Sequence, residues 1–176
     1  MTKLLTILGA TGSIGTQALD VAKHLNMPVY GLSPHQNTAL LEQQARAFNP
    51  RCVAIGDDAR YKTMKAALAD TGISVTAGPD AVAELAAQPV ELVLNAVVGI
   101  AGLSATMACL QAKNALALAN KESLVTAGEL VMAAAKRNNV PVIPVDSEHS
   151  AIFQSMNGEN KKQVQKIILT ASYFKA

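Results

Sequence analysis

Tryptophan is absent from this sequence of 176 residues, and aromatic residues make up only 3% of it. Charge is also scarce, because 16% of the residues are charged and the net charge is +2. The sequence has no basic stripe interleaved with aromatic side chains, so we predict that the protein does not bind nucleic acid. The two cysteines, Cys52 and Cys109, lie in apolar segments, and no Cys/His cluster has zinc spacing. We therefore expect them to be reduced core residues of a cytoplasmic protein.

Long hydrophobic runs are missing as well, although half of the sequence (50%) is hydrophobic. The longest apolar stretches are interrupted well short of the length that spans a bilayer, so we predict no contact with a membrane. The first residues enter an apolar strand without a basic leader or a cleavage site, so we predict no signal peptide. The composition is typical of a globular protein, and the length suffices for one domain with a substantial core.

The sequence does contain a glycine-rich turn within residues 4–15, which read LLTILGATGSIG. An apolar run ends in Gly9, Gly12 and Gly15, and a helical pattern starts near Ser13. Glycine allows a sharp turn close to a ligand, and the start of a helix directs free N–H groups toward that ligand. The stretch therefore predicts a strand, a turn and a helix that together bind a phosphate group. The alternative is a strand-to-helix turn that binds nothing.

Strands and helices alternate through the rest of the sequence, which is typical of a doubly wound, Rossmann-like parallel sheet of the α/β class. Ligands of such sheets bind beyond the carboxyl ends of the strands, so residues that directly follow strands are candidates for the site. After the first strand, we expect strands at 29–33, 52–55, 75–77, 92–98, 116–119, 142–145 and 164–169. We expect helices from about residue 13 and at 38–48, 57–71, 79–87, 103–113, 123–138 and 151–156.

The turn after the second strand, residues 33–37, bears on the choice of cofactor. An NAD-binding sheet usually carries an acidic residue there, which binds the ribose 2′-hydroxyl. This turn reads SPHQN and contains no acid, so it does not repel a 2′-phosphate and favours NADP over NAD. The turn also contains no Arg or Lys that could clamp the phosphate. The alternative interpretation is a simple polar turn.

Residues 120–123, Asn-Lys-Glu-Ser, stand where a predicted strand ends and a predicted helix begins. A Lys–Glu pair at the mouth of a cleft can set a cation against an anionic substrate while the acid orients it. The alternative is that Asn120 or Ser123 caps the helix and that the charges are solvated.

Two carboxylates follow the strand at 142–145. Residues two apart on an extended backbone point the same way, so Asp146 and Glu148 can face one cation. Hard oxygen ligands suit Mg²⁺ or Mn²⁺ rather than zinc, and a third ligand is expected. The alternative is that Asp146 or Ser147 caps the helix at 151–156.

Five segments, in this order and at these intervals, resemble the family of 1-deoxy-D-xylulose 5-phosphate reductoisomerases. They are GATGSIG, NAVVGIAG, LANKESLVTAG, PVDSEHSAIFQ and LTAS, and the resemblance runs from about residue 4 to Ser172. It implies an enzyme that rearranges 1-deoxy-D-xylulose 5-phosphate and reduces it with NADPH and Mg²⁺ or Mn²⁺. The product is 2-C-methyl-D-erythritol 4-phosphate, in the non-mevalonate route to isoprenoids.

The resemblance also implies roles for individual residues. For the cofactor these are Thr11, Gly12, Ser13 and Ile14 at the pyrophosphate, Gln36 and Asn37 near the adenosine phosphate, and Asn120 and Glu122 as further contacts. For the substrate and the metal these are Lys121, Ser147, Glu148 and Ser172 as substrate contacts, and Asp146 and Glu148 as metal ligands.

The sequence departs from the family at two places. The family often has Lys or Arg where this chain has Gln36, which removes a cation from the site of the 2′-phosphate. The family also continues LTAS into Gly-Gly-Pro-Phe, whereas this chain reads YFKA and stops. We therefore predict a truncated reductoisomerase with an NADP-binding domain at 1–145 and the incomplete beginning of an α+β catalytic domain at 146–176, inactive by itself.

The strand expected at 164–169 would then be an unpaired edge, and its pairing with a second copy would give a homodimer. A rival interpretation is a non-catalytic NADP(H)-binding fragment or dimerisation module. A further one is a different dehydrogenase with a similar first domain, of the aspartate-semialdehyde or homoserine type.

Overall fold

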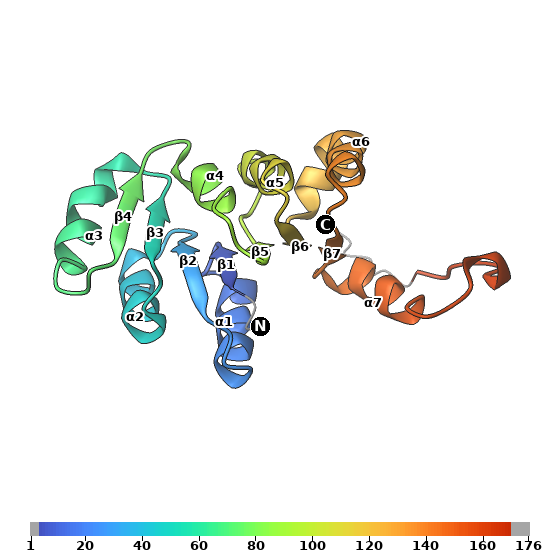
Figure 1. Ribbon diagram of the computed structural model, residues 1–176, viewed down its shortest axis with the longest axis horizontal. Helices are drawn as coiled ribbons and strands as arrows, with labels where there is room; N and C mark the ends of the chain where they lie inside the picture. Colours follow the sequence, from blue (N-terminus) through green and yellow to red (C-terminus); the bar gives the residue numbers. More distant parts are fainter. Residues whose placement is uncertain (1–3, 170–176) are drawn as a thin grey trace, which may run out of the picture.

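The computed structural model describes residues 4–169 and contains a single parallel sheet of seven strands (Figure 1). The spatial order of the strands is β4-β3-β2-β1-β5-β6-β7, and every neighbouring pair is parallel. This confirms the predicted doubly wound α/β class. The strands are β1 (Leu5–Leu8), β2 (Val29–Ser33), β3 (Cys52–Ile55), β4 (Ser74–Ala77), β5 (Leu92–Asn95), β6 (Ala115–Leu118) and β7 (Val142–Pro144).

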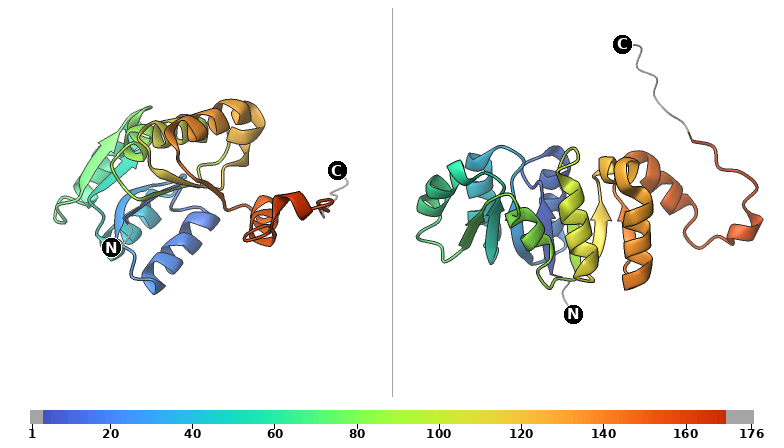
Figure 2. Two further views of the ribbon diagram at one scale, coloured as in Figure 1. Left: turned by 45° about the vertical axis from the view of Figure 1, so that its right-hand side comes forward. Right: turned by 90° about the horizontal axis from the view of Figure 1, so that it is seen from above.

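Helices cover both faces of the sheet, as Figure 2 shows in its left-hand view. The helices α1, α2 and α3 pack on one face, and α4, α5 and α6 pack on the other. The α-helices are α1 (Ser13–His24), α2 (Thr38–Phe48), α3 (Tyr61–Ala67), α4 (Ala81–Ala86), α5 (Gly102–Gln111), α6 (Lys121–Asn138) and α7 (Ser147–Ser155). Two short 3₁₀ helices, η1 (Asp58–Arg60) and η2 (Lys161–Gln163), complete the set.

Each face of the sheet has its own hydrophobic core, because successive strand residues point to opposite faces. In β1, Ile7 packs with residues of α1, α2 and α3, whereas its neighbour Leu8 packs with residues of α4, α5 and α6. Both side chains are fully buried. The central strands therefore read as continuous apolar runs, which is what a sheet buried on both faces requires.

The strand order reverses at β1, which lies between β2 and β5. The chain first proceeds outward from β1 to β4, then returns to β5 and proceeds outward on the other side to β7. Such a reversal opens a crevice above the carboxyl ends of the central strands, and this is the usual ligand position in doubly wound sheets. The glycine turn after β1 lies at this crevice.

The region after β7 differs from the sequence-based prediction. The strand expected at 164–169 is wrong, because these residues form no ladder with any strand of the described region and are exposed. Their apolar pattern favours a strand, but a strand forms only where a neighbour supplies hydrogen bonds. The helix predicted at 151–156 is α7, which begins four residues earlier at Ser147. In residues 4–169 we find no helix long and apolar enough to cross a membrane.

Candidate functional site

The glycine turn places backbone where no larger residue would fit. Gly9 has a φ of +80°, and a Cβ there would come within 2.5 Å of the carbonyl oxygen of Ala96 at the end of β5. A Cβ on Gly15 would collide with the backbone of Gly9 and Ala10. The turn therefore packs tightly against β5 and against the first turn of α1, and both glycines are sterically required.

The first turn of α1 is open to a ligand. Helix α1 begins at Ser13, and its N-cap residue Gly12 provides no side chain that could bond the free N–H groups. Thr11 lies just before the cap, and its Oγ1 accepts a hydrogen bond from the backbone N–H of His35, 2.8 Å away. The predicted residues Thr11, Gly12, Ser13 and Ile14 thus form one helix start that can receive an anion.

The turn after β2 is fixed to the glycine turn at several points. The backbone N–H of Ala10 donates to the carbonyl of Ser33 at 2.7 Å, and that of Gly9 donates to Ser33 Oγ at 3.2 Å. Asn37 is the N-cap of α2, and its Oδ1 accepts from the backbone N–H of Leu40 at 3.0 Å. The structure therefore brings the glycine turn and the turn at 33–37, the two predicted cofactor segments, together at the carboxyl ends of the strands.

A cavity of about 360 Å³ opens beside this turn, between the carboxyl ends of β2, β3 and β5. Arg60, at the end of η1, lines it and donates a hydrogen bond from Nη1 to the carbonyl oxygen of Gln36 at 2.6 Å. Sequence reasoning missed Arg60, because 24 residues separate it from Gln36 and nothing in its local pattern marks a ligand site.

Asn120 confirms the capping alternative for residues 120–123. It is the N-cap of α6, is 1% exposed, and accepts a hydrogen bond on Oδ1 from the backbone N–H of Ser123 at 3.0 Å. Its Nδ2 lies 2.6 Å from the carbonyl of Val97 and 2.8 Å from that of Gly99. Glu122 Oε2 lies 3.2 Å from the same amide. Asn120 therefore holds the loop that connects β5 to α5, and a contact of Asn120 or Glu122 with a cofactor stays a prediction.

A second buried asparagine fixes the same loop from the other end. Asn95, the last residue of β5, donates from Nδ2 to the carbonyl of Gly102 at 2.8 Å and to Thr106 Oγ1 at 2.9 Å. Its Oδ1 accepts from the backbone N–H of Val97 at 3.1 Å. This network ends the strand at Asn95, so the strand predicted to reach residue 98 is three residues shorter.

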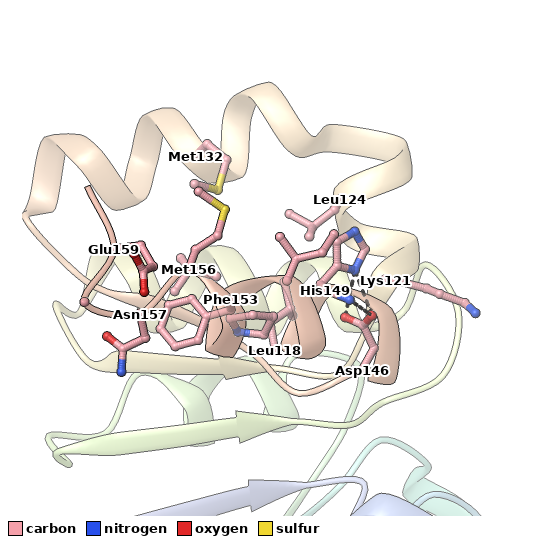
Figure 3. A pocket seen from close by; sticks show the side chains of 14 residues that line it. Leu118, Lys121, Leu124, Met132, Asp146, His149, Phe153, Met156, Asn157 and Glu159 are labelled. Carbon is pink, nitrogen blue, oxygen red and sulfur yellow. Dashed lines mark hydrogen bonds and ion pairs between the residues drawn. The ribbon is translucent and has the colours of Figure 1, made fainter. Parts of the chain in front are cut away.

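Asp146 also confirms its capping alternative, as the N-cap of α7. Its Oδ1 accepts from the backbone N–H of His149 at 3.0 Å, and its two oxygens lie 2.8 and 2.9 Å from His149 Nδ1 (Figure 3). Partial burial raises the pKa of Asp146, but the hydrogen bonds from the backbone and ring of His149 outweigh it. The net pKa lies below the ordinary value, so the carboxylate is charged at neutral pH.

Glu148 and Lys121 complete a small charged group with Asp146. The Ser147 hydroxyl donates to Glu148 Oε2 at 2.9 Å, and this bond is the main reason why the pKa of Glu148 lies below its ordinary value. The charge of Asp146 acts against this shift and the charge of Lys121 favours it. Lys121 and Asp146 also line the same cavity. The structure therefore brings the segments 120–123 and 146–149 together.

The donor set of this group suits a hard cation, because it consists of carboxylate oxygens. It is incomplete as a metal site by itself. Among residues 4–169 no group of three or more His, Cys, Asp or Glu side chains could hold a metal ion. Mg²⁺ is commonly bound through one or two carboxylates with substrate and water, and the side chains of Asp146 and Glu148 are of that chemical type. The prediction that they face one cation from an extended backbone is wrong, because Glu148 lies in helix α7. Their role as metal ligands stays a prediction. The predicted substrate contact Ser172 lies outside the described residues.

An apolar cavity of about 590 Å³ adjoins the charged group and was not predicted from the sequence. It lies between α6 and α7, with Asp146, His149 and Lys121 at one end (Figure 3). Its apolar lining comes from distant segments, so no local pattern announces it. The apolar residues labelled in Figure 3 are Leu118, Leu124, Met132, Phe153 and Met156.

Comparison with known proteins identifies the relatives of this chain. The profile of the 1-deoxy-D-xylulose 5-phosphate reductoisomerase family matches residues 5–128, and the profile of the C-terminal domain of that enzyme matches residues 142–174. The reductoisomerases of Agathobacter rectalis and Porphyromonas gingivalis are each 48% identical over 97% and 98% of this chain. The chain spans 45% of the length of either relative.

Solved structures of the same family share the fold. The reductoisomerase of Zymomonas mobilis in complex with NADPH superposes with a TM-score of 0.89 at 38% identity, over 94% of this chain and 44% of that one. A reductoisomerase in complex with NADPH, fosmidomycin and magnesium gives a TM-score of 0.83 at 33% identity, over 89% of this chain and 40% of that one. Because the family profile covers more than half of it, this chain belongs to the 1-deoxy-D-xylulose 5-phosphate reductoisomerase family.

Proposed function

We propose that this chain provides the cofactor-binding part and the first metal and substrate ligands of a 1-deoxy-D-xylulose 5-phosphate reductoisomerase. The reaction is the rearrangement of 1-deoxy-D-xylulose 5-phosphate and its reduction with NADPH to 2-C-methyl-D-erythritol 4-phosphate. The observation that carries the proposal is that Lys121 and Asp146, from two separate segments, line one end of the same cavity beyond β6 and β7, at the carboxyl ends of the strands where the glycine turn also lies. The names of the relatives agree with it.

The cofactor would lie across the carboxyl edge of the sheet. Residues 11–14 would bind the pyrophosphate through the open start of α1, and Gln36 and Asn37 would contact the adenosine phosphate. Asn120 and Glu122 would contact the cofactor near the loop 96–101, which Asn120 holds in place. A relative with 38% identity has been solved with NADPH, which supports this cofactor.

The substrate would bind beyond β6 and β7. When bound, NADPH supplies a hydride, and Mg²⁺ or Mn²⁺ polarises the carbonyl of the substrate and stabilises the negative oxygen that forms. Asp146 and Glu148 hold the metal ion, and the ring of His149 orients the carboxylate of Asp146. Lys121 would place a positive charge beside an anionic substrate, and Ser147 and Ser172 would be further substrate contacts.

The division of the chain and its assembly belong to the same proposal. We place an NADP-binding domain at 1–145 and the beginning of the catalytic domain at 146–176, on the grounds that close packing on the sheet ends with β7. The apolar side chains exposed at 164–169 favour a homodimer. The modest net charge of +2 gives no support for nucleic acid or a membrane surface as a partner, and we place the protein in the cytoplasm.

The proposal is tested by oxidation of NADPH in the presence of 1-deoxy-D-xylulose 5-phosphate and Mn²⁺, with NADPH binding measured in the same preparation. Turnover that depends on both substrate and metal supports the full proposal. Binding of NADPH without turnover supports the alternative of a non-catalytic NADP(H)-binding module. Absence of NADPH binding in a folded preparation contradicts both.

The metal ligands are tested separately by the substitution Asp146→Asn. Asparagine also caps helices, so α7 stays formed, but the neutral amide is a poorer ligand for a hard cation. We expect the affinity for Mn²⁺ to fall by at least about tenfold in a titration followed by electron paramagnetic resonance. The matched control is Asp80→Asn, since Asp80 is an exposed N-cap of α4 that makes no side-chain capping bond. An equal loss in both variants would contradict the assignment.

A further inference from the structure

Arg60 provides a positive charge at a place where the sequence lacks one. The turn at 33–37 contains no Lys or Arg, yet the guanidinium of Arg60 lies against it, with Nη1 2.6 Å from the carbonyl oxygen of Gln36. The same guanidinium pairs with Asp57, since Nε lies 3.2 Å from Asp57 Oδ2. The hydrogen bond to Gln36 and the ion pair with Asp57 together hold the guanidinium of Arg60 beside the turn at 33–37.

The guanidinium also borders a cavity of the right kind for a nucleotide. The cavity of about 360 Å³ lies between the carboxyl ends of β2, β3 and β5, and its lining includes Arg60 and its ion-pair partner Asp57 together with Ser33, His35 and Gln36. The turn is tied to the glycine turn by the hydrogen bond from the His35 backbone to Thr11. A dinucleotide whose pyrophosphate lies on α1 would therefore place its adenosine ribose near Arg60.

In a doubly wound sheet, the group after the second strand decides between the two nicotinamide cofactors. An acid there binds the 2′-hydroxyl of NAD, whereas a nearby Arg accommodates the 2′-phosphate of NADP. We propose that Arg60 binds the 2′-phosphate of NADPH in this chain and sets its preference for NADPH over NADH. This inference rests on the proposed function, because it assumes that the edge of the sheet binds a nicotinamide dinucleotide.

The donor inventory of Arg60 agrees with this role. A guanidinium has five N–H donors in a planar fork, and such forks bind phosphate oxygens with two parallel bonds. Within residues 4–169, Nη1 donates a hydrogen bond to the carbonyl oxygen of Gln36 and Nε forms an ion pair with Asp57, while Nη2 makes neither kind of contact. The side chain of Arg60 is 44% exposed, so a ligand can reach it. The carboxylate of Asp57 reduces the net positive charge at this place, but its ion pair with Arg60 also holds the guanidinium in one orientation.

The test compares the affinities of the 176-residue chain for NADPH and NADH by calorimetry. We expect Arg60→Gln to weaken NADPH binding by about tenfold or more, the range of a lost charged hydrogen bond, and to change NADH binding by less than about twofold. The matched control is Arg51→Gln. Arg51 is exposed and directly precedes β3, so it lies at the amino ends of the strands, whereas the proposed cofactor site lies at their carboxyl ends. It should leave both affinities unchanged.

A second substitution sharpens the test. In the Arg60→Gln background, Gln36→Lys returns a cation to the same turn and should recover part of the lost NADPH affinity. If the unsubstituted chain prefers NADPH and Arg60→Gln leaves that preference intact, the role of Arg60 is overturned while the proposed function stands. If the unsubstituted chain binds neither nucleotide, the proposed function fails and the role of Arg60 fails with it.

Discussion

The sheet region at 4–145 and the segment at 147–169 bury their apolar side chains to very different degrees. Helix α6, on the sheet, has four buried residues, whereas α7, which follows β7, has none. Phe153 of α7 is 47% exposed, and Ile168 beyond it is 75% exposed. The free energy of folding therefore comes from the sheet and its two cores, and α7 adds little to it.

The candidate site lies across the junction of these two regions. The glycine turn, the turn at 33–37 and Asn120 belong to the packed region, so their geometry is fixed by buried hydrogen bonds. Asp146 and Glu148 lie at the start of α7. This helix is held by the N-cap bond of Asp146 and by contacts along only one of its sides, where it lines the apolar cavity. Cofactor binding should thus be robust to changes in α7, while metal binding should not.

The largest effect that separates the regions is expected from truncation of apolar side chains. Leu116 of β6 is fully buried, so Leu116→Ala should lower the free energy of unfolding by about 2–5 kcal/mol. Phe153→Ala removes a larger but half-exposed side chain and should lower it by less than about 1 kcal/mol. Urea denaturation followed by far-UV circular dichroism gives both values. Equal losses would show that α7 belongs to the cooperative core.

A smaller effect is expected from two glycines that differ in their surroundings. Gly15→Ala forces a Cβ against the backbone of Gly9 and Ala10, and should lower the free energy of unfolding by about 1–3 kcal/mol. The same variant should lose NADPH binding, because the turn must shift. Gly128→Ala is the control in α6, where the added Cβ meets nothing within 4 Å apart from its chain neighbours and the adjacent backbone of its own helix, and it should change stability by less than about 1 kcal/mol. A stable, NADPH-binding Gly15→Ala protein would contradict the tight turn.

The same contrast explains how much the sequence could predict. The six strands expected between residues 29 and 145 appear within a few residues of the expected bounds, because apolar runs that alternate with helical patterns report burial directly. The segment at 164–169 has an equally apolar pattern but is no strand, because pairing depends on a partner that local sequence does not describe. In the sheet region, an apolar run in the sequence corresponds to a buried strand. After β7 this correspondence fails, because the apolar residues at 164–169 are exposed.

Site residues follow the same rule. Residues 11–14, 120–123 and 146–148 were predicted as candidates, because each directly follows a strand. Arg60 was missed, since it reaches Gln36 from a 3₁₀ turn after another strand. The cavity between α6 and α7 was missed because its lining residues lie far apart in the chain. Contacts between distant segments were therefore the part that the sequence left open.

The cap of α7 should produce a local effect. Asp146→Ala removes the acceptor for the His149 backbone N–H, which costs a helix about 1 kcal/mol. We expect the amides of α7 to exchange with solvent about fivefold faster, while those of β1 and β5 keep their rates. Nuclear magnetic resonance resolves the two groups, and Asp146→Asn, which keeps a capping oxygen, is the control. Faster exchange throughout the sheet would mean that the two regions open together.

The smallest effect is expected from acid. The folded pKa of Asp146 lies below its ordinary value, so the charged carboxylate stabilises α7 above that ordinary value, and this contribution is lost as the pH falls through the folded pKa. The loss is smaller than that of Asp146→Ala, because a protonated carboxyl group still accepts a hydrogen bond. The Cα chemical shifts of α7 should move toward unfolded values at acidic pH while those of β1 stay fixed. Asp146→Asn should remove the part of this transition that belongs to Asp146, and an unchanged transition in that variant would assign the pH dependence to other groups.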